Sequence, residues 1–277
     1  MENTTKKTVY KRKKTTKKRR INAKRVKNLL LFITIITAAI IFARSSFFIV
    51  DDIKVVGNKK YASNDIILET GLTTGQNVFK MLGEKPKNLI SFRFNDREQS
   101  IYETMPYIKS ISIRPSLPKS IRIKIQERTP FAILETKGTS LLIDKEGYAL
   151  EVVKDSKLKK KYFKIIGTLV DSYKLGQEVK FKEESPLNVV TNFSDLLIKS
   201  DKNAKIKLYT ILTNVKVSNI NCITADFEDR VSADFRDYDN LEYNISFFRK
   251  VYTSNINKQK GTLIFKAGTD PYFVPKD

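Results

Sequence analysis

The chain has 277 residues and a net charge of +22, from 52 Lys and Arg against 30 Asp and Glu. It has no His, no Trp and a single cysteine, Cys222, which excludes serine–histidine sites, zinc fingers, HExxH zinc sites, intrachain disulfides and CxxC pairs. No GxxxxGK[ST] or GxGxxG sequence occurs, whereas 41% apolar residues are enough to form a buried core. The composition therefore excludes most familiar enzyme chemistries, and we expect no catalytic residue, cofactor or metal site.

The first 28 residues carry 13 Lys and Arg against one Glu. Such a block of like charge is typical of a disordered segment. A nucleic-acid interface is the alternative for a basic tail, but Tyr10 is its one aromatic residue, which leaves no platform for base stacking. We therefore interpret residues 1–28 as a cytoplasmic tail that sets membrane topology and attracts anionic lipid, with no nucleic-acid partner.

An apolar segment follows the tail. Residues 29–43 contain no charge, and the apolar character resumes after Arg44 up to Val50. A bilayer core needs about 20 helical residues, so residues 29–50 predict one transmembrane helix with Arg44 near the interface. A cleaved signal peptide and a buried helix are the alternatives. Against cleavage, the basic region is long and no small-x-small cleavage triplet follows cleanly. The preceding Lys and Arg predict a single-pass type II protein of the cell membrane, with residues 51–277 outside the cytoplasm.

Residues 51–128 have the pattern of a small domain with the order β-α-α-β-β. The expected strands and helices are residues 53–56, 64–70, 96–105, 107–113 and 120–126. The expected helix-capping residues are Ser63, Asn95 with Glu98, and Gly71. In the last strand Ile121, Ile123 and Ile125 alternate with polar residues, which predicts one buried and one wet face.

Residues 106–130 read P-x-I-K-x-I-x-I-R-P-x-L-P-x-x-I-x-I-x-I-x-E-R-x-P, and residues 57–66 read GNKKYASNDI. We expect Glu127 and Arg128 to pair with each other in the hinge that follows this segment. The two sequences and the order of elements resemble the POTRA domain of the FtsQ/DivIB cell-division family. The family's architecture matches as well, with a basic tail, one membrane span, a POTRA domain and a larger β domain.

Residues 129–277 predict a mixed β domain with two helices, so that the whole chain is of the α+β class. The expected strands are residues 131–135, 140–144, 148–152, 163–166, 207–212, 214–217, 220–227, 231–235 and 261–266. Ser185 is expected to cap a helix that begins at Pro186, and residues 241–253 form the second helix, each with one apolar face. The LLIDKEGYAL stretch resembles the opening of the family's β domain.

An acidic cluster and the lone cysteine are the remaining candidates for chemistry. Asp226, Glu228, Asp229 and Asp234 lack the DxDxDG-type spacing of a Ca²⁺ loop, so we expect them on the solvated face of a hairpin. Cys222 lies in an apolar strand and is expected to be a small buried side chain.

The resemblance implies a non-catalytic scaffold of the bacterial division machinery, located at the septum. Its implied partners are FtsL-like and FtsB/DivIC-like single-span proteins, which connect it to septal peptidoglycan synthases. Two alternatives stay open. One is another membrane-anchored POTRA adaptor, in sporulation or secretion. The other is an enzyme acting on wall polymers, for which no Ser-x-x-Lys or paired-carboxylate signature is present.

The candidate partner-binding residues lie in the last part of the chain. Residues 261–266 predict a closing strand with an open edge, which could accept a partner strand through main-chain hydrogen bonds. The candidate residues of this strand and of the aromatic segment after it are Thr262, Leu263, Ile264, Phe265, Lys266, Tyr272 and Phe273. Phe265→Asp or Ile264→Pro should weaken binding to the FtsB/DivIC-like partner and leave the fold largely intact.

Overall fold

The computed structural model describes residues 23–219, 222–236, 238–254 and 259–276. Its first element is α1 (Ala23–Ala43), a helix of 21 residues with no buried side chain. Among the described residues it is the one helix long and apolar enough to cross a membrane, with a mean hydropathy of 2.2. It starts before the expected boundary and includes the last basic residues of the expected tail. Residues 1–22, which hold the rest of that tail, lie outside the described residues.

The helix ends earlier than the sequence predicts. A short 3₁₀ turn, η1 (Ser46–Phe48), follows it, and Phe48 and Val50 are buried in the core of the next domain. The expectation of one helix through Val50 is therefore wrong in its last part. The side-chain amide of Asn77 donates to the carbonyls of Ala43 and Ser45, at 3.0 and 2.9 Å, and so caps the chain where the helix stops.

The small domain after α1 is a three-stranded sheet covered by helices. Its elements are β1 (Asp52–Val56), α2 (Ser63–Thr70), α3 (Val78–Gly83), α4 (Pro86–Ser91), α5 (Asn95–Thr104), β2 (Ile108–Ser116) and β3 (Ser120–Glu127). The strand order is β1-β3-β2, with β1 parallel and β2 antiparallel to β3. The predicted POTRA order is confirmed, and two short helices, α3 and α4, are added between the expected ones. Ile121, Ile123 and Ile125 are buried, as their alternation predicts.

The helix caps of this domain differ from the expected ones. Gly71 does end α2 in the left-handed conformation, with a φ of 62°. Ser63, however, is the first residue of α2 and makes no capping bond, and neither does Asn95 in α5. Glu98 is buried instead of reaching back to the helix start. It pairs with Arg93 at 2.6 Å and accepts the N–H of Ile113 at 2.6 Å, so it joins α5 to the sheet.

The second domain is built on a larger sheet, which we call the large sheet. Its strands, in the order β14-β13-β12-β11-β10-β7-β4-β5-β6, are joined by both parallel and antiparallel pairs. In chain order they are β4 (Pro130–Thr136), β5 (Thr139–Asp144), β6 (Ala149–Val152), β7 (Lys164–Ile166), β10 (Leu212–Asn219), β11 (Cys222–Phe227), β12 (Val231–Phe235), β13 (Gly261–Phe265) and β14 (Tyr272–Pro275). The other elements are α6 (Ser156–Lys161), β8 (Val170–Ser172), β9 (Lys180–Phe181), α7 (Leu187–Ser200), α8 (Leu208–Ile211) and α9 (Leu241–Ser254).

Helices α7 and α9 pack on one face of the large sheet and form the main core. The buried residues are Leu187, Val190, Phe193 and Leu197 of α7 and Leu241, Ile245, Phe248 and Tyr252 of α9, on the apolar faces that the sequence predicts. The two predicted helices are thus confirmed, although Pro186 caps α7 and is not its first residue. The strand expected at residues 207–212 is wrong, because Leu208–Ile211 form the short helix α8. Residues 220–221 of the expected strand 220–227 lie outside the described residues.

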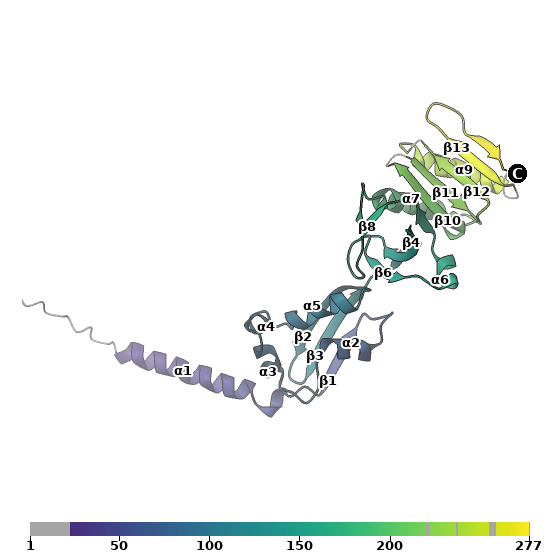
Figure 1. The fold of residues 1–277 in the computed structure, drawn as a ribbon. Coiled ribbons are helices and arrows are strands. Elements are labelled where there is room, and N and C mark those ends of the chain that lie inside the picture. Colours follow the sequence, from purple (N-terminus) through teal and green to yellow (C-terminus); the bar gives the residue numbers. More distant parts are fainter. Residues whose placement is uncertain (1–22, 220–221, 237, 255–258, 277) are drawn as a thin grey trace, which may run out of the picture.

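Figure 1 shows these parts in sequence along an extended molecule. Helix α1 projects from one end, the small domain lies in the middle, and the C-terminal strands lie at the far end. The last strands of the large sheet are therefore the described elements most distant from α1.

Candidate partner-binding site

The C-terminal strands do not have the arrangement expected from sequence. β13 pairs with β12 in parallel on one side and with β14 in antiparallel on the other. A turn containing Gly268, with a φ of 75°, brings β14 back beside β13. The expectation that residues 261–266 form an open edge is therefore wrong, and β14 is the edge strand at this end of the large sheet.

One face of this strand pair belongs to the core. Leu263 and Phe265 are 2% and 1% exposed, and the Phe265 ring stacks on that of Phe235 with centroids 5.1 Å apart. Phe273 lies opposite Leu263 in the register and packs partly against the same core. Three of the candidate residues thus serve the fold on the side covered by α9.

The other face of the strand pair is open. Thr262 lies opposite Val274 and Ile264 lies opposite Tyr272, and these four side chains alternate with the core residues. Thr262 and Ile264 are half-buried, whereas Tyr272 and Val274 are 49% and 44% exposed. This face therefore presents an apolar strip with one aromatic ring, of the kind that anchors a protein partner.

The backbone of β14 offers a short hydrogen-bonding edge. The N–H of Lys276 donates to the carbonyl of Lys260 at 3.0 Å, so in β14 alternate residues face β13. Phe273 and Pro275 then point their backbone polar groups away from β13. Since Pro271 and Pro275 have no N–H, Phe273 supplies the outward amide donor of this strand, and the prolines limit how far pairing can extend.

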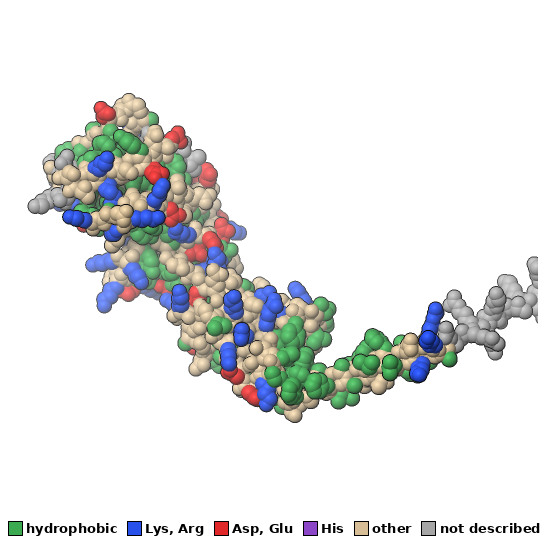
Figure 2. All heavy atoms as spheres, turned by 180° about the vertical axis from the view of Figure 1, so that it is seen from behind, with side chains coloured by type: hydrophobic (Ala, Val, Ile, Leu, Met, Phe, Trp, Pro, Cys, Tyr) green, Lys and Arg blue, Asp and Glu red, His purple; other side chains and the backbone are tan. Residues whose placement is uncertain are grey.

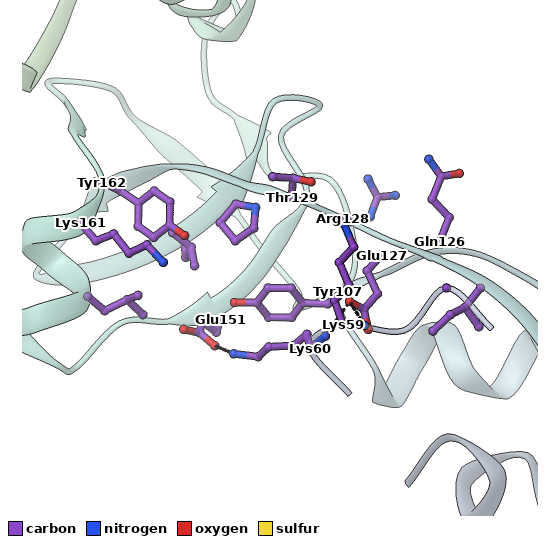
Figure 3. Close-up of a pocket in the computed structure, with 15 residues that line it drawn as sticks. Lys59, Lys60, Tyr107, Gln126, Glu127, Arg128, Thr129, Glu151, Lys161 and Tyr162 are labelled. Atoms are coloured by element: carbon purple, nitrogen blue, oxygen red, sulfur yellow. Dashed lines mark hydrogen bonds and ion pairs between the residues drawn. The ribbon is translucent and has the colours of Figure 1, made fainter. Parts of the chain in front are cut away.

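A second candidate site is the junction between the two domains. A cleft of about 720 Å³ opens there, lined from the small domain by Lys59, Lys60 and Tyr107 among others, and from the large sheet by Glu151 and Leu142. In Figure 3, Lys60 and Glu151 face each other across the cleft, and an ion pair joins them at 3.4 Å. Charged and aromatic side chains of both domains therefore line the same cleft.

The expected pairing of Glu127 with Arg128 is wrong, because each side chain turns to other partners. The Glu127 carboxylate accepts three backbone N–H bonds, from Lys59 at 2.9 Å, Lys60 at 2.7 Å and Tyr61 at 3.2 Å. It thereby holds the loop between β1 and α2 against the end of β3. These bonds use both carboxylate oxygens within the small domain.

Arg128 instead binds the second domain. Its guanidinium donates to Asp144 at 2.7 Å and to Glu146 at 3.1 Å, and it stacks 3.4 Å from the centre of the Tyr148 ring. Lys109 of β2 also pairs with Glu146. These hydrogen bonds, from Lys109 and then from Arg128, lower the pKa of the Glu146 carboxyl below its ordinary value.

Tyr107 completes the junction through packing. It is 5% exposed and lies in a small apolar cluster with Ile133 and Leu142, which face away from α7 and α9. Its backbone N–H donates to the Tyr61 hydroxyl at 3.3 Å, and the two rings meet edge to face. Burial raises the pKa of both tyrosines, and Glu151 adds to the effect at Tyr107. The cleft is thus bounded by groups that already bind one another, which favours a structural joint.

A family model described as "POTRA domain, FtsQ-type" matches residues 80–128, which run from α3 to the arginine of the junction. "Cell division protein DivIB" of Clostridium tetani is 28% identical over 187 residues, 66% of this chain and 66% of that protein. The protein of the same name from Clostridium acetobutylicum is 29% identical over 183 residues, 66% of this chain and 65% of its own. "Cell division protein FtsQ" of Bartonella bacilliformis is 28% identical over 106 residues, or 38% and 30% of the two chains.

These matches support the FtsQ/DivIB family for this chain. The aligned part spans just under two thirds of the length of the two clostridial relatives. Within the residues that the structure describes, no group of three His, Cys, Asp or Glu side chains lies close enough to hold a metal ion. Three residues of the acidic cluster, Asp226, Glu228 and Asp234, bind other side chains of the protein. Asp226 accepts from Ser232 at 2.6 Å, and Asp234 pairs with Arg236 at 2.8 Å.

Cys222 is less buried than its apolar strand predicts. Cys222 is half-buried, not buried, and lies 3.7 Å from an oxygen of Asp234. Partial burial, and then the neighbouring Asp234 charge, raise the pKa of the thiol above its ordinary value. Because a thiol with a raised pKa is a poor nucleophile at neutral pH, its surroundings do not favour catalysis.

Proposed function

We propose that this chain is a membrane-anchored, non-catalytic scaffold of the bacterial division machinery. It binds FtsL-like and FtsB/DivIC-like single-span proteins outside the cytoplasmic membrane, and these connect it to septal peptidoglycan synthases. The POTRA domain then covers residues 51–128, and residues 129–277 form the partner-binding domain. The similarity to proteins named for cell division supports this role, and the open edge at β14 is the observation that carries it.

A partner strand would add to β14 through the backbone. It would receive the N–H of Phe273 and donate to the outward carbonyls of the strand. Tyr272 and Val274 would provide contacts on the open face of the sheet, next to Ile264. The interface would remain short, because the two prolines withhold further donors.

The test compares two variants that both remove the ring of Phe273. Phe273→Ala keeps the outward N–H, and Phe273→Pro removes it without breaking a bond to β13. One hydrogen bond contributes about 0.5–1.5 kcal/mol, so Phe273→Pro should bind the FtsB/DivIC-like partner about 2- to 10-fold more weakly than Phe273→Ala. The affinity of full-length protein for the partner, both reconstituted in vesicles, checks this. Equal affinities would contradict strand addition at β14.

The proposed location is the division septum, with the N-terminus in the cytoplasm. The basic residues that precede and begin α1 support this orientation. Protease added to cells stripped of their wall should digest the POTRA and C-terminal domains and spare the tail. A protected C-terminal domain would contradict the orientation, and a fluorescent fusion that stays off the septum would contradict the location.

A further inference from the structure

An apolar surface lies beside the end of α1 that joins the POTRA domain. Leu89 and Ile90 of α4 are 49% and 87% exposed, and Phe92, directly after α4, is 37% exposed. Phe47, in the turn after α1, is 52% exposed. In Figure 2 the green side chains where α1 meets the POTRA domain form one continuous area with those of α1. We name these four residues, Phe47, Leu89, Ile90 and Phe92, the α4 patch.

A chain of aromatic contacts connects the patch to the helix. Phe42 in the last turn of α1 stacks with Phe47 and meets Phe48, at centroid distances of 6.0 and 5.2 Å. Phe48 contacts Phe79 of α3 at 4.9 Å, and Phe79 contacts Phe92 at 6.2 Å. The patch is therefore fixed to α1 through packed rings.

The patch lies alongside the apolar part of α1, not beyond its end. A groove of about 650 Å³ separates the two, lined by Ile36, Ile40 and Ala43 on the helix and by Phe79 and Leu89 on the POTRA side. Ile36 precedes Ala43 by two helical turns, or about 10 Å along the axis. If α1 crosses a bilayer, this part of the POTRA domain is level with apolar residues of the span.

The length of the apolar part of α1 also indicates that the adjoining POTRA surface lies within the membrane. The uncharged residues 29–43 extend about 22 Å at 1.5 Å per residue, whereas the hydrocarbon core is about 30 Å thick. The difference of about 8 Å falls within the roughly 5–10 Å to which interfacial helices insert. The α4 patch lies on the side of the membrane where that difference has to be covered.

The contacts of α4 with α5 fix the orientation in which its apolar residues are exposed. The buried Asn88 side chain donates to Asp96 at 2.5 Å and accepts the N–H of Asn95 at 3.0 Å, which anchors the helix to α5. Phe92 ends α4 in the left-handed conformation, with a φ of 51°. That conformation disfavours a bulky residue, so Phe92 is strained in the position that places its ring beside Phe79.

Basic side chains surround the patch. Arg44 and Lys80 line the groove together with Glu84, and Lys85 and Lys87 are exposed at the start of α4. Each basic residue near an anionic membrane surface contributes about 1 kcal/mol. An apolar centre with a basic rim fits a layer of anionic lipid, with acyl chains facing the patch and phosphates facing the rim.

We propose that the α4 patch inserts into the outer leaflet of the cytoplasmic membrane, so that the POTRA domain lies on the lipid with α4 at the hydrocarbon boundary. The inference rests on the proposed membrane topology of α1. It fixes the tilt of the POTRA domain, because one face of the domain is held at the bilayer.

The absence of tryptophan from the chain makes a clean test possible. Full-length Ile90→Trp, Ile36→Trp and Leu169→Trp proteins are each reconstituted in vesicles of phosphatidylethanolamine and phosphatidylglycerol that contain brominated acyl chains. Ile36 reports the span, and Leu169, which is 55% exposed in the C-terminal domain, is the control. Ile90→Trp should emit at shorter wavelength and lose about half of its fluorescence through contact with lipid at interfacial depth. Leu169→Trp should lose almost none.

The outcomes separate this inference from the proposed topology. If Ile36→Trp is quenched and Ile90→Trp is not, the span stands and the α4 patch is not in lipid. If neither is quenched, α1 does not cross the membrane and both proposals fail. If Ile90→Trp is unquenched in lipid and shifts only when a single-span partner is added, the groove holds a partner helix, which overturns the lipid assignment. Replacing Lys80, Lys85 and Lys87 by Gln should reduce the quenching of Ile90→Trp in vesicles with phosphatidylglycerol.

Discussion

Arg128 and Asp144 form a buried ion pair, with a nitrogen–oxygen distance of 2.7 Å and 7% exposure of each side chain. Arg128 belongs to the link between the domains, whereas Asp144 ends β5. Asp144 also accepts the N–H groups of Glu146 and Tyr148, and so closes the turn into β6. One carboxylate thus organises the turn and fixes the arginine of the link.

Replacing Arg128 by Met should strongly destabilise the C-terminal domain. Loss of one partner leaves the Asp144 charge buried, which costs about 3–5 kcal/mol in comparable pairs. Thermal unfolding of the full-length protein in detergent, followed by near-ultraviolet circular dichroism, should show a lower midpoint for the C-terminal domain. Lys109→Met is the matched control. It removes an exposed ion pair with Glu146 and should cost at most about 1 kcal/mol. Equal effects of the two substitutions would argue against a structural role for the buried pair.

Replacing Glu127 by Gln should loosen the loop between β1 and α2. The substitution places an amide donor where one carboxylate oxygen now accepts N–H groups, and hydrogen bonds to a charged group contribute about 1.5–3 kcal/mol. Amide hydrogen exchange at Lys59, Lys60 and Tyr61 should become about 10-fold faster or more. Asp52→Asn, which removes an exposed carboxylate of β1, should leave these amides unchanged. Unchanged exchange in Glu127→Gln would show that the carboxylate is not needed there.

The sequence predicted those elements in which one pattern decides the structure. Alternating isoleucines in β3 and the one-sided apolar residues of α7 and α9 identify these elements, because each buries a face along its whole length. Gly71 was predicted as a helix stop for a local reason, since the left-handed conformation suits glycine. The POTRA order follows from these signals together.

The elements that were missed are short or are decided by distant partners. Helices α3 and α4 have 6 residues each, too few for a helical period to stand out. The β14 strand has 4 residues and is flanked by proline, so its pairing with β13 is not visible in local sequence. Glu98 matched a capping pattern, but its carboxylate satisfies Arg93 and a strand N–H, and this tertiary partner prevails. For the same reason the partners of Arg128 at the junction could not be read from its neighbours in the chain.

Phe265 and Tyr272 should respond very differently to substitution. Phe265 is 1% exposed and packs against Phe235 and Phe247, so Phe265→Ala should cost about 3–5 kcal/mol of unfolding free energy. The expectation that Phe265→Asp or Ile264→Pro spares the fold is therefore wrong. The first buries a charge, and the second breaks a strand that is paired on both sides. Tyr272→Ala, on the open face, should change stability by about 0.5 kcal/mol or less. Urea unfolding of both alanine variants checks the contrast, and similar midpoints would place Phe265 outside the core.

The contact between Tyr252 and Glu228 should make the stability of the C-terminal domain fall at alkaline pH. Tyr252 is 2% exposed, its hydroxyl donates to Glu228 at 2.7 Å, and Arg230 donates to it at 2.8 Å. Burial, and then the bond to Glu228, raise the pKa of Tyr252 from 10.0 to about 12. Since the folded pKa is the higher one, this tyrosine stabilises the fold fully below pH 10 and loses that contribution as the pH rises towards 12. At the acid end, the bond from Tyr252 lowers the pKa of Glu228, so its contribution is lost as the pH falls through that value.

A comparison of Tyr252→Phe with the unsubstituted protein isolates this group from the other residues that titrate at high pH. The unsubstituted protein should lose on the order of 2 kcal/mol more stability than Tyr252→Phe between pH 10 and 12. Tyr272→Phe is the matched control, because it removes a hydroxyl that is exposed on the edge strand, and its pH profile should follow that of the unsubstituted protein. Urea unfolding at steps of pH from 7 to 12 measures all three. Parallel profiles of stability against pH for Tyr252→Phe and the unsubstituted protein would contradict this prediction. They would mean that the pKa of the Tyr252 hydroxyl is the same in the folded and unfolded states, so that its contact with Glu228 does not raise it.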